Sequence, residues 1–425
     1  MKRNMMKMTF KLVAIFLAVC PSLLAQAGPS ATAGNAALRY TFRYAQSAEF
    51  GGGLGDWQTA SPSAELDYSN GNSRHLFNVD YTGGYIWTVG GPSYGTGMFQ
   101  RLLLSQGLVW PKWNFLVGDS VGYYPEAPIT GFSGIPGIGE PIGTPNPAPP
   151  SSQSILTLNT NVVENTVSGN LSHILDFATS LSLGGSSDML RYPDGNGLNT
   201  NSQMANGGPA FRINARNSLS AQYLFSQFSY PDYNYSFMTN SVMFVYQRAW
   251  TRSLTSSVSL GPEWIGGSNN SFISIPPSTT ISAQATVNYQ RRSVSAGVGY
   301  SRGTTGGSGY LFGSETDSVV GTFSREFDKK LTLGLTGGFM HNSELGTAGT
   351  GLRTTGIGSG LTGTIESEFA GVQASRKLGR YFSCFANYTA TNQSYPGSLP
   401  NNVLNEYWQL VSFGLAYSRE ISPGH

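Results

Sequence analysis

The segment ISAQATVNYQRRSVSAGVGYS, residues 281–301, predicts two β-strands joined by a short turn. Apolar and polar residues alternate along both halves, which is the two-residue period of an extended strand. One face of the first half is apolar and contains Ile281, Ala283, Ala285, Val287 and Tyr289. The other face carries Ser282, Gln284, Thr286 and Asn288. Such a hairpin needs an apolar environment on one side only, either a protein core or a lipid bilayer.

The composition favours the bilayer. Only 11% of the 425 residues are charged, whereas 12% are aromatic and 54 are glycine. Soluble domains usually have a charged fraction of about 25%. Few charges combined with many aromatic, glycine, serine and threonine residues are typical of a membrane β-barrel, whose strands have one apolar and one polar face. The polar face of residues 282–288 is therefore predicted to form part of a lumen wall.

The N-terminus has the pattern of a secretory signal peptide. Four basic residues come first: Lys2, Arg3, Lys7 and Lys11. A mostly apolar stretch, residues 12–24, and the small-residue motif Ala25-Gln26-Ala27 follow them. We predict a signal peptide over residues 1–27 and a periplasmic segment over 28–36. Cleavage removes four of the 25 basic and none of the 23 acidic residues, which leaves 21 against 23. Without a basic excess, nucleic-acid binding is not expected.

The chain has two cysteines. Cys20 lies in the apolar stretch, where Leu17-Ala18-Val19-Cys20 is an imperfect lipoprotein motif, so lipidation of Cys20 is an alternative to an ordinary signal peptide. Cys384 is the only cysteine of the mature chain. No internal disulfide is therefore expected.

Short and long connections alternate between the predicted strands. Short junctions, such as residues 290–292 and 327–329, are followed by longer polar loops, such as 192–206 and 342–360. In a transmembrane barrel the short turns face the periplasm and the longer loops face outward. Residues 37–421 therefore predict an all-β, antiparallel up-and-down barrel of about 18 strands, with 16 as the alternative. Both termini are expected on the periplasmic side, with a short tail at 422–425.

One loop differs from the rest. Residues 124–153 contain eight of the chain's 22 prolines and many glycines, so they are expected to form neither a ladder nor a helix. A loop of this length is either functional or an exposed surface segment. If it folds into the lumen, it becomes a constriction loop, whose candidate residues are Phe132, Ile135, Ile138 and Glu140.

The last strand resembles a known family. In Ser412-Phe413-Gly414-Leu415-Ala416-Tyr417, a polar residue, a glycine and an aromatic residue follow the spacing of the C-terminal assembly signal of bacterial outer-membrane β-barrels. Arg419 stands where that signal usually has an apolar residue, and residues 421–425 replace a terminal aromatic. The GFSGIP stretch at 131–136 is similar to uncharacterised barrel proteins of this group. The resemblance implies an outer-membrane, porin-like barrel that is inserted by the barrel-assembly machinery.

The strongest functional candidates are charged residues on predicted lumen faces. They are Arg39 and Arg43 on the first strand, Glu65 and Asp67 on the second, and Asp80 on the third. Such charges select solutes in pores, or they pair across the strands and only hold the wall. The four histidines are scattered without metal-ligand spacing, and no catalytic or phosphate-binding motif is present. We therefore expect neither a metal nor a cofactor. An outer-membrane barrel enzyme, whose catalytic residues would come from different strands, is a disfavoured alternative, because a barrel of about 18 strands encloses an aqueous lumen.

Two functions remain open. The first is a porin-like channel for passive diffusion of small hydrophilic solutes across the outer membrane. The second is a structural or surface-interaction barrel without an open pore, and a soluble β-protein is disfavoured by the missing charged exterior. The sequence leaves the solute and the oligomeric state undetermined.

Overall fold

The computed structural model describes residues 37–51, 56–71, 74–90, 96–126, 160–195, 197–269, 273–307, 311–348, 363–394 and 406–421. The predicted signal peptide with Cys20, the segment 28–36 and the tail 422–425 lie outside these residues. So does residue range 127–153 of the proline-rich loop. Among the described residues, no helix is long and apolar enough to cross a membrane.

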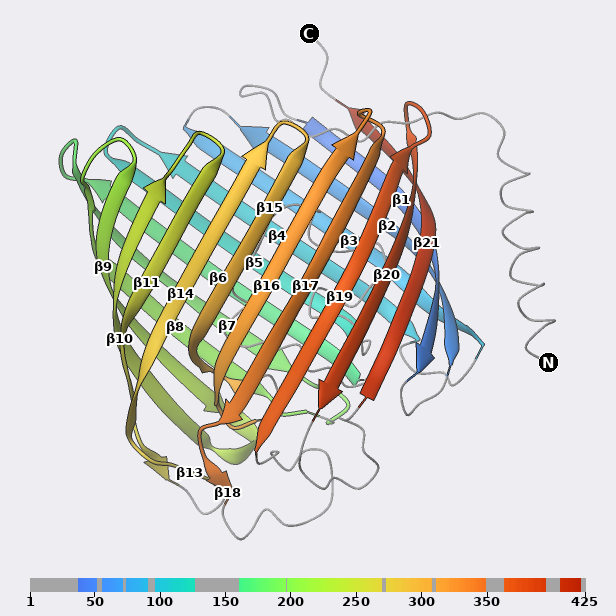
Figure 1. Ribbon diagram of the computed structural model, residues 1–425. Helices are drawn as coiled ribbons and strands as arrows, with labels where there is room; N and C mark the ends of the chain where they lie inside the picture. Colours follow the sequence, from blue (N-terminus) through green and yellow to red (C-terminus); the bar gives the residue numbers. More distant parts are fainter. Residues whose placement is uncertain are drawn as a thin grey trace.

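Eighteen antiparallel strands form one sheet (Figure 1). In chain order they are β1 (Ala37–Gly51), β2 (Trp57–Gly71), β3 (His75–Gly90), β4 (Gly97–Val109), β5 (Trp113–Glu126), β6 (Thr160–Ile174), β7 (Thr179–Arg191), β8 (Thr200–Arg212), β9 (Asn217–Tyr230), β10 (Tyr235–Ala249), β11 (Leu254–Ile265), β14 (Ser278–Arg291), β15 (Val294–Thr305), β16 (Ser314–Phe327), β17 (Leu331–Glu344), β19 (Thr364–Lys377), β20 (Phe382–Ser394) and β21 (Glu406–Ile421). The prediction of an all-β barrel with about 18 strands is confirmed, and the alternative of 16 is wrong.

The sheet closes on itself because β1 pairs with β21. The register runs from Leu38 opposite Ile421 to Gly51 opposite Trp408 without interruption. Every other strand pairs with its neighbours in chain order, as Figure 1 shows for the tilted strands of the wall. A closed ladder leaves no strand edge unpaired, which is the condition for a sheet to cross a bilayer.

The two ends of the barrel differ in their connections. At one end eight turns of two to four residues join the strands, and β1 begins and β21 ends there too. At the other end nine connections span four to 33 residues. We call these the short-turn end, at the top of Figure 1, and the loop end. The shortest loop-end connection contains the 3-10 turn η1 (Pro231–Tyr233).

The loop end contains a small sheet that the sequence did not predict. It consists of β12 (Ser268–Asn269), β13 (Ile273–Ile275) and β18 (Thr347–Ala348). β13 pairs with both others, so it joins the connection after β11 to the connection after β17 (Figure 1). Strands of two or three residues are too short to show a periodic pattern.

The two faces of the wall have opposite character. Along β14 and β15, Ile281, Val287 and Val298 point outward and are 57%, 48% and 56% exposed. On the inward face of the neighbouring strands, Ser259 and Ser318 are 6% and 1% exposed. This distribution is the reverse of that in a soluble protein. Because such an apolar exterior is stable only in contact with lipid, the barrel is transmembrane.

The prediction that residues 124–153 form no ladder is wrong for residues 124–126, which are the end of β5 and pair with β6. A proline is also accommodated within β2, which begins at Trp57 and continues past Pro62. Pro62 lacks an N–H group, and the pairing between β2 and β3 is interrupted between Ala60 and Ser63. On the other side of β2, Tyr44 of β1 lies opposite Pro62, so the pairing with β1 continues past the proline.

The unusual Arg419 has an aromatic partner. It lies opposite Tyr40 on the outward face near the short-turn end of β21. Its guanidinium carbon lies 5.9 Å from the ring centroid of Tyr381. A cation over an aromatic ring at the membrane interface is compatible with this position.

Closure depends on a glycine in the last strand. Gly414 lies opposite Ala45 of β1 and Phe385 of β20. A Cβ at this position would overlap the Phe385 ring and the carbonyl oxygen of Tyr44.

We predict that Gly414→Val lowers the free energy of unfolding by about 1–3 kcal/mol, as overpacking usually does. The measurement is the urea midpoint of the folded barrel in detergent. Gly97→Ala is the control, because nothing lies within 4 Å of a Cβ there, and equal midpoints for both variants would contradict this role.

Candidate functional site

A network of charged side chains lines the inner wall of β1 to β4. The register places Arg39 opposite Asp67, and Asp67 opposite Asp80. Glu65 lies two residues before Asp67 and therefore on the same face. Because these strands are consecutive and paired, residues separated by up to 41 positions in sequence meet at one place in the wall.

The arginines of β1 hold the carboxylates of β2. Nε of Arg39 donates to Oδ2 of Asp67 at 2.5 Å, and a guanidinium nitrogen of Arg39 lies 3.6 Å from Oε1 of Glu65. Arg43 forms an ion pair with Glu65. The Glu65 side chain is only 12% exposed, so these contacts replace much of its hydration. They are stronger than exposed surface ion pairs for that reason.

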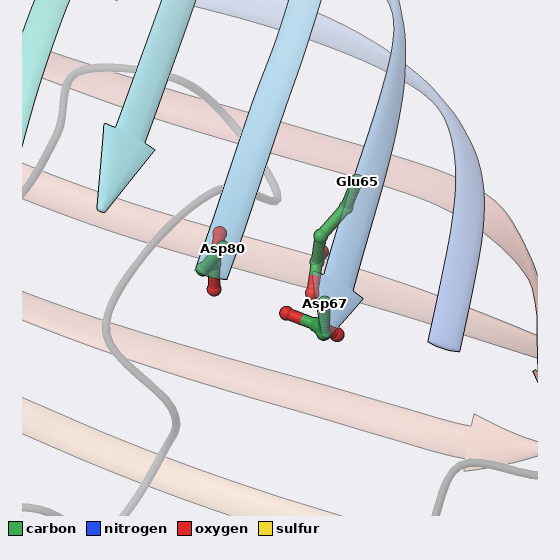
Figure 2. A group of neighbouring side chains, drawn as sticks. All are labelled: Glu65, Asp67 and Asp80. Carbon is green, nitrogen blue, oxygen red and sulfur yellow. The ribbon is translucent and has the colours of Figure 1, made fainter. Parts of the chain in front are cut away.

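The acidic members of the network lie close together. One carboxylate oxygen each from Glu65, Asp67 and Asp80 lies within 4.8 Å of the other two. Figure 2 shows these side chains on two adjacent strands, with Glu65 and Asp67 on one and Asp80 on the other. Arg101 of β4, opposite Thr82, contributes a further positive charge beside Asp80.

Two of these three carboxylates are held in ion pairs. A cation site needs oxygens that are free to coordinate. Here Asp67 and Glu65 already accept from guanidinium groups. Three acidic groups and three arginines balance at this point of the wall, where the carboxylates of β2 and β3 lie between the arginines of β1 and β4. The arrangement produces a strong local field without a large net charge.

The predicted lumen wall of β14 faces inward. Ser282, Gln284, Thr286 and Asn288 lie opposite Gly261, Ser259, Ser257 and Thr255 of β11. On the other side, Gln284 lies opposite Ser301 of β15. This wall is uncharged and consists of small or polar residues. It lies across the barrel from the ion-pair network, because β14 is separated from β2 by eight and ten strand steps in the two directions around the ring.

The predicted constriction residues Phe132, Ile135, Ile138 and Glu140 lie outside the described residues. Their placement therefore stays a prediction. The described part of the chain has another feature that narrows the lumen, and the sequence reasoning missed it.

An aromatic cluster covers the inner wall at the loop end. Its buried members are Leu198, Phe228, Tyr230, Tyr235, Phe237, Ile265, Ile275 and Phe312. Phe312 comes from the connection between β15 and β16, and its ring centroid lies 5.2 Å from that of Tyr230. Tyr230 also donates its hydroxyl to the carbonyl of Gly306 at 3.0 Å. These contacts fasten a loop-end connection to the inside of the barrel.

A sequence signal for this cluster existed. Along β9 and β10, Phe228, Tyr230, Tyr235 and Phe237 occupy the same face as Ser226, Thr239 and Ser241. Large aromatic residues at the loop-side ends of otherwise polar faces indicate packing against a loop. Assigning these aromatic residues to one cluster required the register between β9 and β10, in which Phe228 lies opposite Phe237.

A second charged group lies on the outer wall near the loop end. Arg302 of β15 forms ion pairs with Glu315 and Asp317 of β16. Tyr300 donates its hydroxyl to Asp317 at 2.7 Å. By alternation these residues share the outward face of Val298 and Val319. They form a polar edge between the apolar band and the loop end.

Comparisons with known proteins find matches among solved structures. No protein-family model matches the chain, and no characterised protein matches its sequence. Among solved structures, Pseudomonas aeruginosa OprD is 9% identical with a TM-score of 0.42, over 94% of this chain and 100% of that one. Acinetobacter baumannii OccAB4 is 10% identical with a TM-score of 0.46, over 92% and 99%.

Pseudomonas aeruginosa OpdQ is similar to the same degree. It is 10% identical with a TM-score of 0.43, over 91% of this chain and 100% of its own. TM-scores below 0.5 at this level of identity do not assign a function to the chain. The fold assignment rests on the strand pairing of this chain, which is a closed 18-strand barrel with an apolar exterior, the architecture of bacterial outer-membrane porins.

We predict that Arg43→Gln lowers the free energy of unfolding by about 1–3 kcal/mol, because it leaves the largely buried Glu65 without one of its charged partners. Adding Glu65→Gln to this variant is expected to restore part of the loss. Urea unfolding of the four proteins in a double-mutant cycle measures the coupling. Glu366→Gln serves as control, since this side chain is 50% exposed. A coupling energy of zero would mean that the pair does not stabilise the wall.

Proposed function

We propose that the protein is a porin-like channel of the bacterial outer membrane, through which small hydrophilic solutes diffuse passively. The observation that carries the proposal is the inversion of polarity in a closed 18-strand barrel, with an apolar outer face and an inner face of hydroxyl, amide and charged groups. A barrel of this size is wide enough to enclose an aqueous channel.

Space inside the barrel supports the proposal. A cavity of about 800 Å³ lies against the inner wall at the short-turn end. Its lining includes Arg212, Ser218, Gln247, Thr286 and Asn288, all from inward faces. Polar groups that line a space of this size are more stable when water hydrates them than when they are buried against other side chains.

The ion-pair network supplies the selectivity in this proposal. Arg39, Arg43 and their acidic partners face the lumen on one side, whereas the β14 wall is uncharged. A solute that passes between them experiences a transverse field, which orients dipolar and charged molecules. The alternative role of the same pairs is to hold β1, β2 and β3 together.

The cellular context belongs to the same proposal. The signal peptide exports the chain, the barrel-assembly machinery recognises the last strand, and the bilayer of the outer membrane surrounds the apolar band. The short-turn end then faces the periplasm. Diffusion through the lumen requires neither a catalytic group nor a cofactor.

A barrel without an open pore is the second candidate. The observation that favours it is the aromatic cluster, which binds a loop-end connection against the inside of the mouth. In this function the loops at that end would contact surface polysaccharide, phage or other cells, and solutes would not pass.

We predict discrete conductance steps when the purified barrel is inserted into planar bilayers. Silence from protein that is folded, as judged by heat-modifiable migration on gels, would favour the closed barrel. Recovery of the chain in the soluble fraction without detergent would remove both functions.

Neutralising one arginine is expected to shift ion selectivity toward cations. A unit charge about 10 Å from the pore axis contributes roughly 0.4 kcal/mol in water, which is about a twofold change in the permeability ratio. Reversal potentials of Arg39→Gln and Arg43→Gln in a dilute KCl gradient measure it, because salt screens the effect at higher concentration. Arg376→Gln, on the outward face of β19 opposite Leu331, is the matched control. Unchanged selectivity in both lumen variants would reject this role for the network.

A further inference from the structure

Glu263 is a buried carboxylate on the inner wall that faces neutral groups. It lies near the loop end of β11 and is only 5% exposed. The hydroxyls of Thr239 and Thr304 and the backbone of Thr304 lie beside the carboxylate as neutral hydrogen-bonding groups, but its Oε2 has no hydrogen-bond partner of ordinary geometry among the described residues. A buried carboxylate oxygen without a partner is costly, so native structures rarely retain one without a reason.

The carboxylate borders a cavity of about 420 Å³ inside the barrel. The other polar lining groups are hydroxyls and amides, among them Ser168, Asn170, Asn206, Ser241 and Ser282. Glu263 is the only ionisable residue among the described residues that line this cavity. The cavity therefore combines one negative charge with neutral hydrogen-bonding groups from several strands.

Among the described residues that line the cavity, none carries a positive charge that could compensate Glu263. The charged side chain that acts on it from β16 is a second carboxylate, Glu315. The guanidinium of Arg302 is already paired with Glu315 and Asp317. In this respect Glu263 differs from Glu65, whose charge is matched by Arg43. The missing counter-charge points to a cation that enters from solution.

A glycine keeps the space before the carboxylate open. A Cβ at Gly303 would lie 3.8 Å from Oε2 of Glu263 and 3.4 Å from Oγ of Ser282. These are ordinary van der Waals distances, so a larger side chain at this position would extend into the cavity without breaking the strand. The glycine therefore offers a way to block the site while the charge is retained.

The position of the cavity suits a solute on its way through the barrel. Ile265, two residues from Glu263 on the same face, belongs to the aromatic cluster at the loop end. Glu263 thus lies next to the cluster, on the side of the loop connections that faces the middle of the barrel. β11 is nine strand steps from β2 in either direction around the ring, so Glu263 and the ion pairs of β2 are on opposite walls.

We propose that this cavity binds the protonated amine of a small hydrophilic solute, with Glu263 as the counter-ion and the surrounding hydroxyl and amide groups as partners for the remainder of the molecule. The inference rests on the proposed channel function and specifies its solute class as organic cations. Charge-assisted hydrogen bonds between an ammonium group and a carboxylate provide the discrimination against neutral molecules of the same size.

Equilibrium binding to the detergent-solubilised full-length barrel tests the site. The probes are 1,4-diaminobutane, a dication, and 1,4-butanediol, a neutral molecule of similar length. Wild-type protein is expected to bind the diamine more tightly than the diol. Glu263→Gln is expected to weaken diamine binding about tenfold or more, as the loss of a charged hydrogen bond does, and Glu263→Asp to retain part of the affinity.

Two further variants separate the charge from the shape of the site. Gly303→Val is expected to weaken diamine binding while Glu263 is still present. Glu366→Gln, which changes a carboxylate on β19 that is half exposed, is expected to bind like wild type. Heat-modifiable migration establishes that each variant is folded. Equal affinity of wild type and Glu263→Gln, or equal affinity for diamine and diol, would overturn the proposal.

A current measurement distinguishes this inference from the channel function. If the barrel conducts, the diamine is expected to reduce the potassium current of wild type and to leave that of Glu263→Gln unchanged. Binding without conductance would retain the site and reject the channel. Conductance without diamine binding would retain the channel and reject the site.

Discussion

The pairing of β1 with β21 is the contact on which the rest of the structure depends. In a bilayer no water is available for unpaired backbone groups, and each orphaned N–H or carbonyl costs several kcal/mol. Fourteen residue pairs between the first and the last strand remove both edges of the sheet at once. A wall with one apolar face and one polar face can exist in a membrane only after this closure, because an open sheet would expose its edges to lipid.

Closure also determines what each face can do. The outward face is apolar and needs no partner other than lipid, which is why many large apolar side chains remain exposed. The inward face is sheltered from lipid and can carry charge. Both the ion pairs of Arg39 and Arg43 and the unpaired Glu263 lie on it. The outward face also carries some charged residues, among them Arg302 near the loop end and Arg376 and Arg419 near the short-turn end.

The inner wall is not uniform around the barrel. Charges balance each other on β1 to β4, the inward residues 282–288 of β14 are neutral, and Glu263 on β11 has no compensating positive charge among the described residues. The aromatic cluster narrows the loop end beside Glu263. In the proposed function, a solute that enters on that side meets the cavity of Glu263 first and the balanced charges on β1 to β4 later. The proposed channel thus combines a binding position with an orienting field, whereas a uniform wall would act only as a sieve.

The sequence by itself determined the architecture, because a barrel strand interacts mainly with its neighbours in the chain. Alternation along residues 281–301, the order of short and long connections and the charge content were local signals, and they were sufficient for the strand number. They also located Arg39, Arg43, Glu65, Asp67 and Asp80 on three consecutive strands, so their meeting could be anticipated. Only the tertiary structure decided which groups meet across loops and between more distant strands. Phe312 reaches Tyr230 through a loop without periodicity, and the isolation of Glu263 depends on what β10, β15 and β16 place around it. A missing counter-charge is a property of a complete surrounding, and no local pattern in one strand encodes it.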